Sequence, residues 1–303
     1  MERLEELKKR LRSRCPSLEL RADEPMAKHT TFRIGGPAAL MALPGTQAEA
    51  EAAVWAAREL DIEPFFLGNG SNLLVSDSGY PGFLIKPAGE FAQIREAGRA
   101  LEAGSAVLLS RRSGRALERG LAGLEFASGI PGSMGGAIAM NAGAYGGEIA
   151  QVLEEVDFLD EVGELRALPA SECEFGYRHS VFSDRRCLIL RGRFRLEQGD
   201  PEAIRARVDE LTAQRKAKQP LEYPSAGSMF KRPPGHFAAA LIDQCGLKGF
   251  SVGGAQVSEK HAGFVVNRGG ASCADVLELV DRVRERVLTR TGVELEMEVK
   301  VLR

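Results

Sequence analysis

Residues 126–147 constrain this chain most, because they carry no charged side chain and contain seven glycines. The run approaches the length that spans a bilayer, but its glycines, Pro131 and Asn141 would leave backbone polar groups unsatisfied in lipid. We therefore expect a loop system and no membrane span. Glycine in ordered structure costs about 0.5–1 kcal/mol per residue relative to alanine. So many glycines indicate a ligand that approaches the main chain closely, with tight turns packed against other backbone as the alternative.

The overall composition is that of a globular protein of 303 residues, with 44% hydrophobic and 27% charged residues. Disordered and fibrous proteins are excluded. Forty lysines and arginines against 42 acidic residues give a net charge of −2, so no overall field attracts nucleic acid or an anionic membrane. We expect a small-molecule partner, with no nucleic acid and no membrane bound.

The cysteines indicate a reducing compartment. There are five, widely spaced, and none falls in a CxxC pair or a Cys/His cluster with metal-ligand spacing. Residues 1–20 alternate charged residues with leucines and lack the apolar stretch of a secretory signal. We therefore expect a cytoplasmic protein with free thiols and no metal site.

Secondary-structure patterns divide the chain into three parts, residues 1–88, 89–197 and 198–292. The first part mixes helices with short strands, the second is mainly antiparallel strand separated by glycine-rich turns, and the third begins with a helix and contains two more. The last residues, 293–302, alternate strictly between apolar and charged side chains, which predicts a half-buried strand. The expected fold class is therefore α+β.

Individual elements follow from periodicity and from capping residues. Helices are expected over residues 2–14, 47–60, 237–245 and 272–291, with another that begins at Asp200-Pro201. Short strands are expected at residues 63–68, 73–75, 83–85, 107–109, 152–159 and 188–190. Ser272 with Asp275 predicts a capping box, and Gly292 predicts the end of that helix.

Another glycine-rich segment, Leu67 to Asn72, follows one of these strands. It is not a dinucleotide-binding fingerprint, because Leu73 stands where GxGxxG requires its third glycine and no helical pattern follows. Alone, the segment fits an ordinary tight turn or an anion cradle, since glycines let several N–H groups face one point. Together with residues 129–147, it implies one large polyphosphate ligand held by main-chain amides.

Six segments, in order along nearly the whole chain, carry a resemblance to a known family. They are His29 to Pro37, Gly68 to Leu74, Gly129 to Gly147, Tyr177 to Phe182, Gln219 to Arg232 and Leu295 to Val301. In these segments the sequence resembles the UDP-N-acetylenolpyruvoylglucosamine reductases, flavoenzymes of peptidoglycan precursor synthesis. The resemblance implies an FAD-binding domain of the vanillyl-alcohol-oxidase (PCMH) type, with subdomains at residues 1–88 and 89–197. It also implies a substrate-binding domain at 198–292, and a C-terminal strand, 293–303, that folds back onto the first subdomain.

The reaction implied by this resemblance is reduction of FAD by NADPH, followed by hydride transfer to the enolpyruvyl group of UDP-N-acetylglucosamine enolpyruvate. The product is UDP-N-acetylmuramate. FAD is expected to be non-covalent, because no histidine is a clear candidate for a flavin link. For Arg33, a structural salt bridge is the alternative to a flavin contact. The FAD-binding residues implied are Arg33, Leu67, Gly68, Asn69, Gly70, Ser71, Asn72, Gly129, Ile130, Pro131, Gly132, Ser133, Gly135, Gly136, Ala137, Asn141, Gly143 and Ala144.

Three residues acquire catalytic roles through the same resemblance. Arg178 is expected to stabilise enolate-like charge beside the substrate carboxylate, since a guanidinium stays cationic and binds a carboxylate at two points. Ser228 is expected to donate the proton that completes the reduction. Glu298 is expected to polarise the enolate or to supply that proton. From the residues alone, Arg178 fits a surface arginine and Ser228 a turn residue. The alternation does not distinguish Glu298 from Glu294 and Glu296 on a solvated face.

Substrate contacts are expected from Tyr177, Lys218 and Tyr223, with a solvated basic helix end as the alternative for Lys218. Because only Leu221 separates Gln219-Pro220 from Glu222 and Tyr223, the chain resembles the shorter of two reductase types, which lacks an extra tyrosine-bearing loop over the substrate. A monomer is expected. Two alternatives are another FAD oxidoreductase of the same fold that takes hydride from an alcohol, and a flavin-binding module without turnover.

Overall fold

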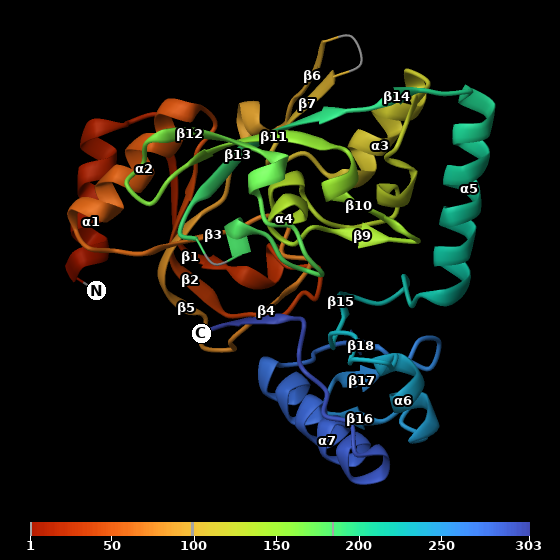
Figure 1. The fold of residues 1–303 in the computed structure, drawn as a ribbon. Helices are drawn as coiled ribbons and strands as arrows, with labels where there is room; N and C mark the ends of the chain where they lie inside the picture. The colour runs from red at the N-terminus through yellow and green to blue at the C-terminus, as the bar shows by residue number, and fades with distance from the viewer. Residues whose placement is uncertain (1, 98–99, 184) are drawn as a thin grey trace. The chain divides into compact units, whose positions relative to one another are not determined.

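The computed structural model describes residues 2–97, 100–183 and 185–303 (Figure 1). The chain forms two compact units. Unit 1 comprises Met1–Ala22, Ala39–Asn69 and Gly82–Ala213, and unit 2 comprises Asp23–Ala38, Gly70–Pro81 and Gln214–Arg303. The three-part division expected from the sequence stays a prediction.

The largest sheet of unit 1 has five strands in the order β12-β11-β13-β7-β6 (Figure 1). Their bounds are Leu165–Pro169, Leu153–Leu159, Leu188–Arg195, Ala100–Gly104 and Ile94–Ala97. Helices α3 (Leu109–Glu118) and α4 (Met134–Ala139) share a buried apolar cluster with this sheet. Every pairing in the sheet is antiparallel, so the antiparallel character expected for this stretch is confirmed.

The strand expected at residues 107–109 is wrong. Leu108 forms only an isolated bridge with Ser133, and Leu109 is already the first residue of α3. Three consecutive apolar residues cannot distinguish a strand from the entry to a buried helix.

The loop system expected over residues 126–147 needs a similar correction. It contains the six residues of α4, followed by the short antiparallel pair β9 (Gly143–Ala144) and β10 (Gly147–Glu148). Gly135 and Gly136 lie inside α4, and glycine's poor helix propensity conceals this turn of helix in the sequence.

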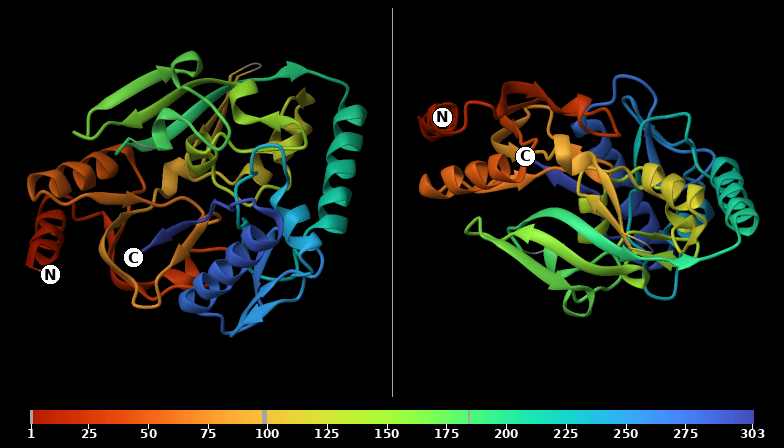
Figure 2. Two further views of the ribbon diagram at one scale, coloured as in Figure 1. Left: turned by 60° about the horizontal axis from the view of Figure 1, so that its bottom comes forward. Right: turned by 90° about the horizontal axis from the view of Figure 1, so that it is seen from above.

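The second sheet has the order β1-β2-β5-β3, and β3 runs parallel to β5. Its strands are Glu19–Pro25, Pro37–Leu43, Tyr80–Ile85 and Pro64–Phe66. Helices α1 (Glu2–Arg14) and α2 (Gln47–Glu59) lie side by side (Figure 2), and Thr46 caps α2 by accepting a hydrogen bond from Glu49 N. Both helices are confirmed within a residue of their expected ends. A further short pair joins β8 (Leu121–Ala122) to β14 (Glu197–Gln198).

Unit 2 packs two helices against a four-stranded antiparallel sheet of order β15-β18-β17-β16. The strands are Ser225–Ser228, Phe264–Asn267, Ala255–Val257 and Ser251–Val252, and the helices are α6 (Ala238–Gln244) and α7 (Cys273–Thr291). The expected capping box of Ser272 and Asp275 opens α7, and Gly292 closes it at a φ of 72°. Helix α5 (Pro201–Lys218) begins at the predicted residue and ends in this unit.

The C-terminal strand is shorter than expected. Only β19 (Lys300–Leu302) is regular strand, and it pairs in parallel with β4 (Leu73–Val75), which confirms that the chain end returns to an N-terminal strand. Upstream, Met297 forms an isolated bridge with Phe230. The predicted alternation persists there, with Leu295 buried between exposed glutamates, but this isolated bridge does not extend into a ladder.

The remaining elements are 3₁₀ turns at Met26–Lys28, Gly89–Ala92, Glu125–Ala127, Ile149–Gln151, Ala170–Glu172 and Val181–Ser183. Within the described ranges, no helix combines the length and the apolar character needed to cross a membrane.

Candidate active site

The part of the first glycine segment that belongs to unit 1, residues 67–69, lies beside the second glycine segment, residues 129–147. Asn69 Nδ2 donates a hydrogen bond to the carbonyl oxygen of Pro131 at 2.5 Å. A Cβ atom placed on Gly68 would lie 2.5 Å from Ser133 Oγ. These segments are about sixty residues apart in the chain, and their contact creates a shared surface of backbone and hydroxyl groups.

Buried hydroxyls at this contact fit a phosphate-bearing ligand. Ser133 Oγ and Ser105 Oγ are buried, and within the described part of the chain neither has a hydrogen-bond partner. Gly135 N donates to Ser105 O, which brings both hydroxyls to the same segment. Because burying an unpaired polar group costs free energy, such groups indicate a missing partner. The diphosphate of FAD would supply acceptor oxygens for both.

Gly136 gives a second indication of a ligand. A Cβ atom there would meet only Ser133 Oγ, at 3.7 Å, and the backbone has no positive φ. Alanine is favoured over glycine inside a helix by about 1 kcal/mol, so neither packing nor conformation explains this glycine. Gly70 differs, because its Cβ would lie 2.1 Å from His29 O at a φ of +62°. The protein itself requires Gly70, whereas the open space at Gly136 suits a ligand held by the main chain.

Arg178 lies at the tip of a tight turn, and in space this turn contacts the last part of the glycine-rich run, residues 126–147. Gly176 and His179 close the turn through an isolated bridge, and Arg178 has a φ of +54°. Residues other than glycine adopt this region sparsely, and such strain gathers at functional sites. The guanidinium donates from Nη2 to Gly143 O at 3.5 Å. The arginine predicted to act on the substrate is therefore next to a segment predicted to bind the cofactor.

Asn141 supports that turn with its side chain. Its Nδ2 donates to Gly176 O at 3.1 Å, and its Oδ1 accepts from Ala150 N at 3.0 Å. Both ends of the buried amide are thus used within the protein.

Tyr177, predicted to contact the substrate, is 58% exposed, with the Arg178 guanidinium 5.2 Å from its ring centre.

Ser228 and Glu298 come together in unit 2. Ser225 pairs with Val266 and Ser228 with Phe264, so three steps along β15 oppose two along β18. This is a β-bulge, a feature that re-aims a side chain next to active sites. Ser228 is exposed, and its neighbour Met229 accepts a hydrogen bond at the carbonyl from Glu298 N at 2.9 Å.

The structure also distinguishes the three glutamates that alternation left equivalent. Glu296 forms an ion pair with Lys231, and Glu294 forms one with Arg284 at 3.3 Å. Both have side chains more than 70% exposed. Glu298 is half-buried, and Asn72 Nδ2 donates to its carbonyl oxygen at 3.1 Å. Of the three glutamates, only Glu298 directly follows Met297, whose bridge with Phe230 joins this part of the chain to the segment that contains Ser228.

Another segment that carries the family resemblance, His29 to Pro37, also lies in unit 2. Thr31 Oγ1 donates to Ser225 O at 2.7 Å, and Thr31 N donates to Gly70 O. Arg33 is exposed with a φ of +57°.

Near Ser228, the ring of His261 packs edge-on against Phe264, and burial lowers the pKa of this histidine, which keeps it neutral at pH 7.

The expected substrate residues Lys218 and Tyr223 flank the short connection from α5 to β15. Lys218 is the exposed last residue of α5. The Arg268 guanidinium lies 4.2 Å from the centre of the Tyr223 ring, and the buried Gln219 Oε1 has no hydrogen-bond partner within the described ranges. Sequence reasoning missed Arg268 and Ser105, because neither lies in a motif; only their spatial neighbours reveal them.

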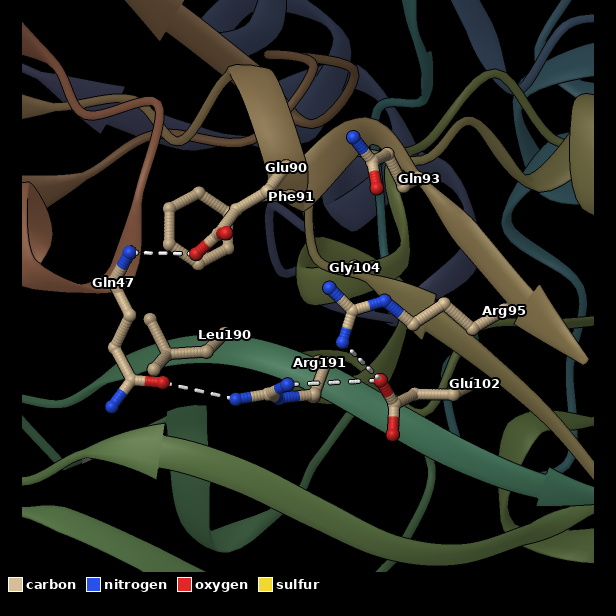
Figure 3. A pocket seen from close by; sticks show the side chains of 9 residues that line it. All are labelled: Gln47, Glu90, Phe91, Gln93, Arg95, Glu102, Gly104, Leu190 and Arg191. Carbon is tan, nitrogen blue, oxygen red and sulfur yellow. Dashed lines mark hydrogen bonds and ion pairs between the residues drawn. The ribbon is translucent and has the colours of Figure 1, made fainter.

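A polar pocket of about 290 Å³ elsewhere in unit 1 contains none of the predicted site residues (Figure 3). It is lined by Gln47, Glu90, Phe91, Gln93, Arg95, Glu102, Gly104, Leu190 and Arg191. Arg191 donates to Gln47 Oε1 at 3.0 Å and pairs with Glu102 at 3.7 Å and with Asp157 at 3.0 Å. Glu90 accepts from Gln47 N at 2.7 Å. Protein groups therefore pair the principal charges here.

Comparisons with known proteins show the family of this chain. Residues 38–168 match the family described as FAD binding domain, and residues 219–302 match the family described as UDP-N-acetylenolpyruvoylglucosamine reductase, C-terminal domain. A protein named UDP-N-acetylenolpyruvoylglucosamine reductase from Heliobacterium modesticaldum is 48% identical over 92% of this chain and 89% of its own length. One of the same name from Agathobacter rectalis is 47% identical over 97% of each chain.

A solved structure agrees with these sequences. The crystal structure of UDP-N-acetylenolpyruvylglucosamine reductase from Thermus caldophilus superposes with a TM-score of 0.82 at 38% identity. It covers 94% of this chain and 99% of its own. The expected fold class, an α+β FAD-binding domain followed by a second α+β domain, is confirmed. The resemblance predicted from six motifs is confirmed as well, and the chain belongs to the UDP-N-acetylenolpyruvoylglucosamine reductase family.

Proposed function

We infer that this chain is an FAD-containing oxidoreductase that uses NADPH to reduce UDP-N-acetylglucosamine enolpyruvate to UDP-N-acetylmuramate in peptidoglycan precursor synthesis. Relatives named for this reductase match it over nearly its whole length. The structural observation that carries the inference is the meeting of two glycine segments around the unpaired Ser133 hydroxyl. Neither another FAD oxidase of this fold nor a flavin-binding module without turnover is favoured.

Main-chain groups and small hydroxyls of unit 1 hold the cofactor. Bound FAD, which is non-covalent, supplies hydride transfer from NADPH to the substrate. Gly68, Asn69, Ser133 and Gly136 bind its diphosphate, because backbone amides can approach a phosphate closely where no Cβ intervenes. The proposal keeps the other cofactor-binding residues expected from the sequence.

Arg178 stabilises the charge that develops on the substrate. Hydride addition to the enolpyruvyl group leaves negative charge beside the carboxylate, and a fixed guanidinium lowers the free energy of that state. The strained turn presents the side chain beside Gly143. Asn141 anchors the turn, so little reorganisation is needed when charge develops.

Ser228 donates the proton to the carbon that bears the carboxylate. A hydroxyl is a weak acid at neutral pH, so it acts only on a strong base held within hydrogen-bond reach. The Ser228 hydroxyl is exposed at the bulge that contains Gly227, and the backbone bond from Glu298 N to Met229 O joins Glu298 to the residue after Ser228. Glu298 polarises the enolate or takes part in delivering the proton. Tyr177, Lys218 and Tyr223 contact the sugar nucleotide, with Lys218 supplying positive charge for the diphosphate.

Two finer points complete the proposal. The protein is a monomer, which light scattering of the purified protein tests directly. It is located in the cytoplasm, where its five free cysteines remain reduced, and fractionation of cells tests this location.

The reaction is tested by following the flavin spectrum under anaerobic conditions. Purified protein is expected to be yellow, to lose its visible absorbance on addition of NADPH, and to regain it on addition of UDP-N-acetylglucosamine enolpyruvate. Protein that binds no FAD contradicts the assignment. Flavin that NADPH bleaches but the enolpyruvyl substrate does not restore would instead support another oxidoreductase of this fold.

A further inference from the structure

Arg112 is a fully buried arginine without an acidic partner. It belongs to α3, has no exposed surface, and lies within the apolar cluster of unit 1. Its guanidinium carbon is 3.3 Å from the centre of the Phe194 ring, and Nη2 donates to Leu101 O at 3.3 Å. Among the described residues, no carboxylate forms an ion pair with it, and its Nε has no hydrogen-bond partner. Burial lowers the pKa of Arg112 well below its usual value, because the charged form loses its hydration.

Such an arrangement costs stability unless a charge elsewhere offsets it. Buried charges in proteins are normally paired, and an apolar side chain of similar size is often neutral or stabilising in their place. Stacking on Phe194 provides part of the compensation. It leaves Nε without an acceptor, so the surroundings of Arg112 do not by themselves account for an arginine.

The side chain of Arg112 lies next to the second glycine segment, residues 129–147. Nη1 of Arg112 contacts Met134 Sδ at 4.0 Å, and Met134 follows Ser133, whose hydroxyl is unpaired. The entry to α3 is bonded to the same segment, since Leu109 N donates to Gly132 O at 3.0 Å. Three buried polar atoms without partners, on Ser105, Ser133 and Arg112, are thus linked to residues 132–135.

We propose that Arg112 is a positioning residue for the cofactor, and that its buried charge attracts the diphosphate held by residues 132–136 without touching it. This inference rests on the proposed function, because it requires an anion on that segment. In a buried environment a charge is screened far less than in water, so it acts through the intervening Met134. Arg112 therefore lowers the stability of the protein without FAD and raises its affinity for FAD.

The test is equilibrium binding of FAD to protein freed of cofactor, measured by quenching of flavin fluorescence. Arg112→Met removes the charge and fills the apolar space, and Arg112→Gln removes the charge and keeps a polar end. Arg111→Met is the matched control, because Arg111 is exposed and bonds only Ala92 O. Riboflavin, which lacks the diphosphate, serves as a second ligand that separates charge attraction from distortion of the site.

We expect Arg112→Met and Arg112→Gln to weaken FAD binding by about tenfold or more, with Arg111→Met within about twofold of the unmodified protein. Riboflavin affinity should not change, and the melting temperature of FAD-free Arg112→Met should equal or exceed that of the original. Equal losses for FAD and riboflavin in the Met and Gln variants would overturn the proposal and assign Arg112 a packing role. Failure of the unmodified protein to bind FAD would instead contradict the proposed function.

Discussion

Two polar regions of unit 1 differ in how their buried groups are paired. In the pocket around Arg191, protein groups pair the principal charges: Asp157, Glu102 and Gln47 all contact this one guanidinium. At and next to the second glycine segment, Ser133, Ser105 and Arg112 each have a buried polar atom without a hydrogen-bond partner among the described residues. Folding alone selects for pairing, since unpaired buried polar atoms cost free energy.

This difference is the basis on which we propose a ligand at the glycine segments and not at the Arg191 pocket. The Arg191 pocket encloses a cavity, but the polar groups that line it form hydrogen bonds and ion pairs with one another (Figure 3). We therefore assign these paired groups a role in stability. The glycine segments satisfy each other poorly and leave open space at Gly136. We therefore base the proposed binding site on unpaired groups and unexplained glycines and not on cavity volume. The following substitutions test this distinction between paired and unpaired groups.

The largest effect is expected from Ser228→Ala. Within the described residues the Ser228 hydroxyl has no hydrogen-bond partner, and it is the proposed proton donor. Reduction of the flavin by NADPH should be unchanged, while reoxidation by the enolpyruvyl substrate should slow by about 10²–10⁴-fold. Stopped-flow absorbance measures both half-reactions. Ser251→Ala, which removes a hydroxyl already bonded to Gly249 O, is the control; equal slowing of both half-reactions would remove Ser228 from the donor role.

Arg178→Lys is expected to have the next largest effect. The charge is retained, but the two-point contact with a carboxylate is lost, so kcat/KM should fall by about 10²-fold. The matched control is Arg166→Lys, because Arg166 is exposed and paired with Asp160 at 3.0 Å. Steady-state kinetics measures both variants, and near-normal turnover by Arg178→Lys would exclude the proposed role.

Gly136→Ala should change the stability of the protein and its affinity for FAD in opposite directions. The added methyl has room in the protein, so stability without FAD should rise by about 0.5–1 kcal/mol, while FAD affinity should fall by about tenfold or more. Gly114→Ala in α3 also has nothing within 4 Å of its Cβ, and it should gain the same stability with unchanged affinity. Calorimetric melting and FAD titration measure the two quantities. Unchanged FAD affinity in Gly136→Ala would mean that the ligand does not approach this helix.

The smallest effect concerns the paired pocket and appears in the pH dependence of stability. Burial raises the pKa of Asp157, aided by Glu155 and Glu102 and opposed by Arg191. The native state therefore holds the proton of the Asp157 carboxyl group more tightly than the unfolded chain does. The stabilising contribution of the protonated form is then present below the unfolded pKa, near 4, and is lost as pH rises through the native pKa.

Asp160 provides a control of opposite sign. Burial raises its pKa, but hydrogen bonds from Glu164 N, Arg166 and Val162 N outweigh this and lower it. Its contribution is present above the unfolded pKa and is lost as pH falls through the native value. Urea unfolding of Asp157→Asn and Asp160→Asn across pH 3–7 should give relative stabilities that change with pH in opposite directions. Changes in the same direction would contradict the assignment of Asp157 to a buried pair.

Local signals in the sequence predicted much of the fold. The capping box at Ser272 and the apolar face of α7 are confirmed because capping and helical periodicity act within a few residues. Three local patterns failed at residues 107–109, at α4 and at the C-terminal strand. In each, a short segment takes its conformation from a partner distant in the chain, such as Ser133 for Leu108 and Phe230 for Met297.

The candidate site was predictable only in part. The glycine segments could be identified from composition, and the family resemblance alone selected Arg178, Ser228 and Glu298. Pattern could not distinguish Glu298 from Glu296, because the distinction depends on Lys231 and Met229, which lie about seventy residues earlier. Arg112 has no signal in the sequence, since an arginine in a helix is ordinarily exposed, and only three-dimensional packing reveals its burial.

The most direct test of the account is a crystal structure of this protein with FAD bound. The account predicts that the diphosphate bridge lies between Gly68 and the Ser133–Gly136 turn, with the Ser133 hydroxyl donating to a phosphate oxygen and Arg112 behind it. A cofactor bound elsewhere, with both glycine segments touching only protein, would contradict it.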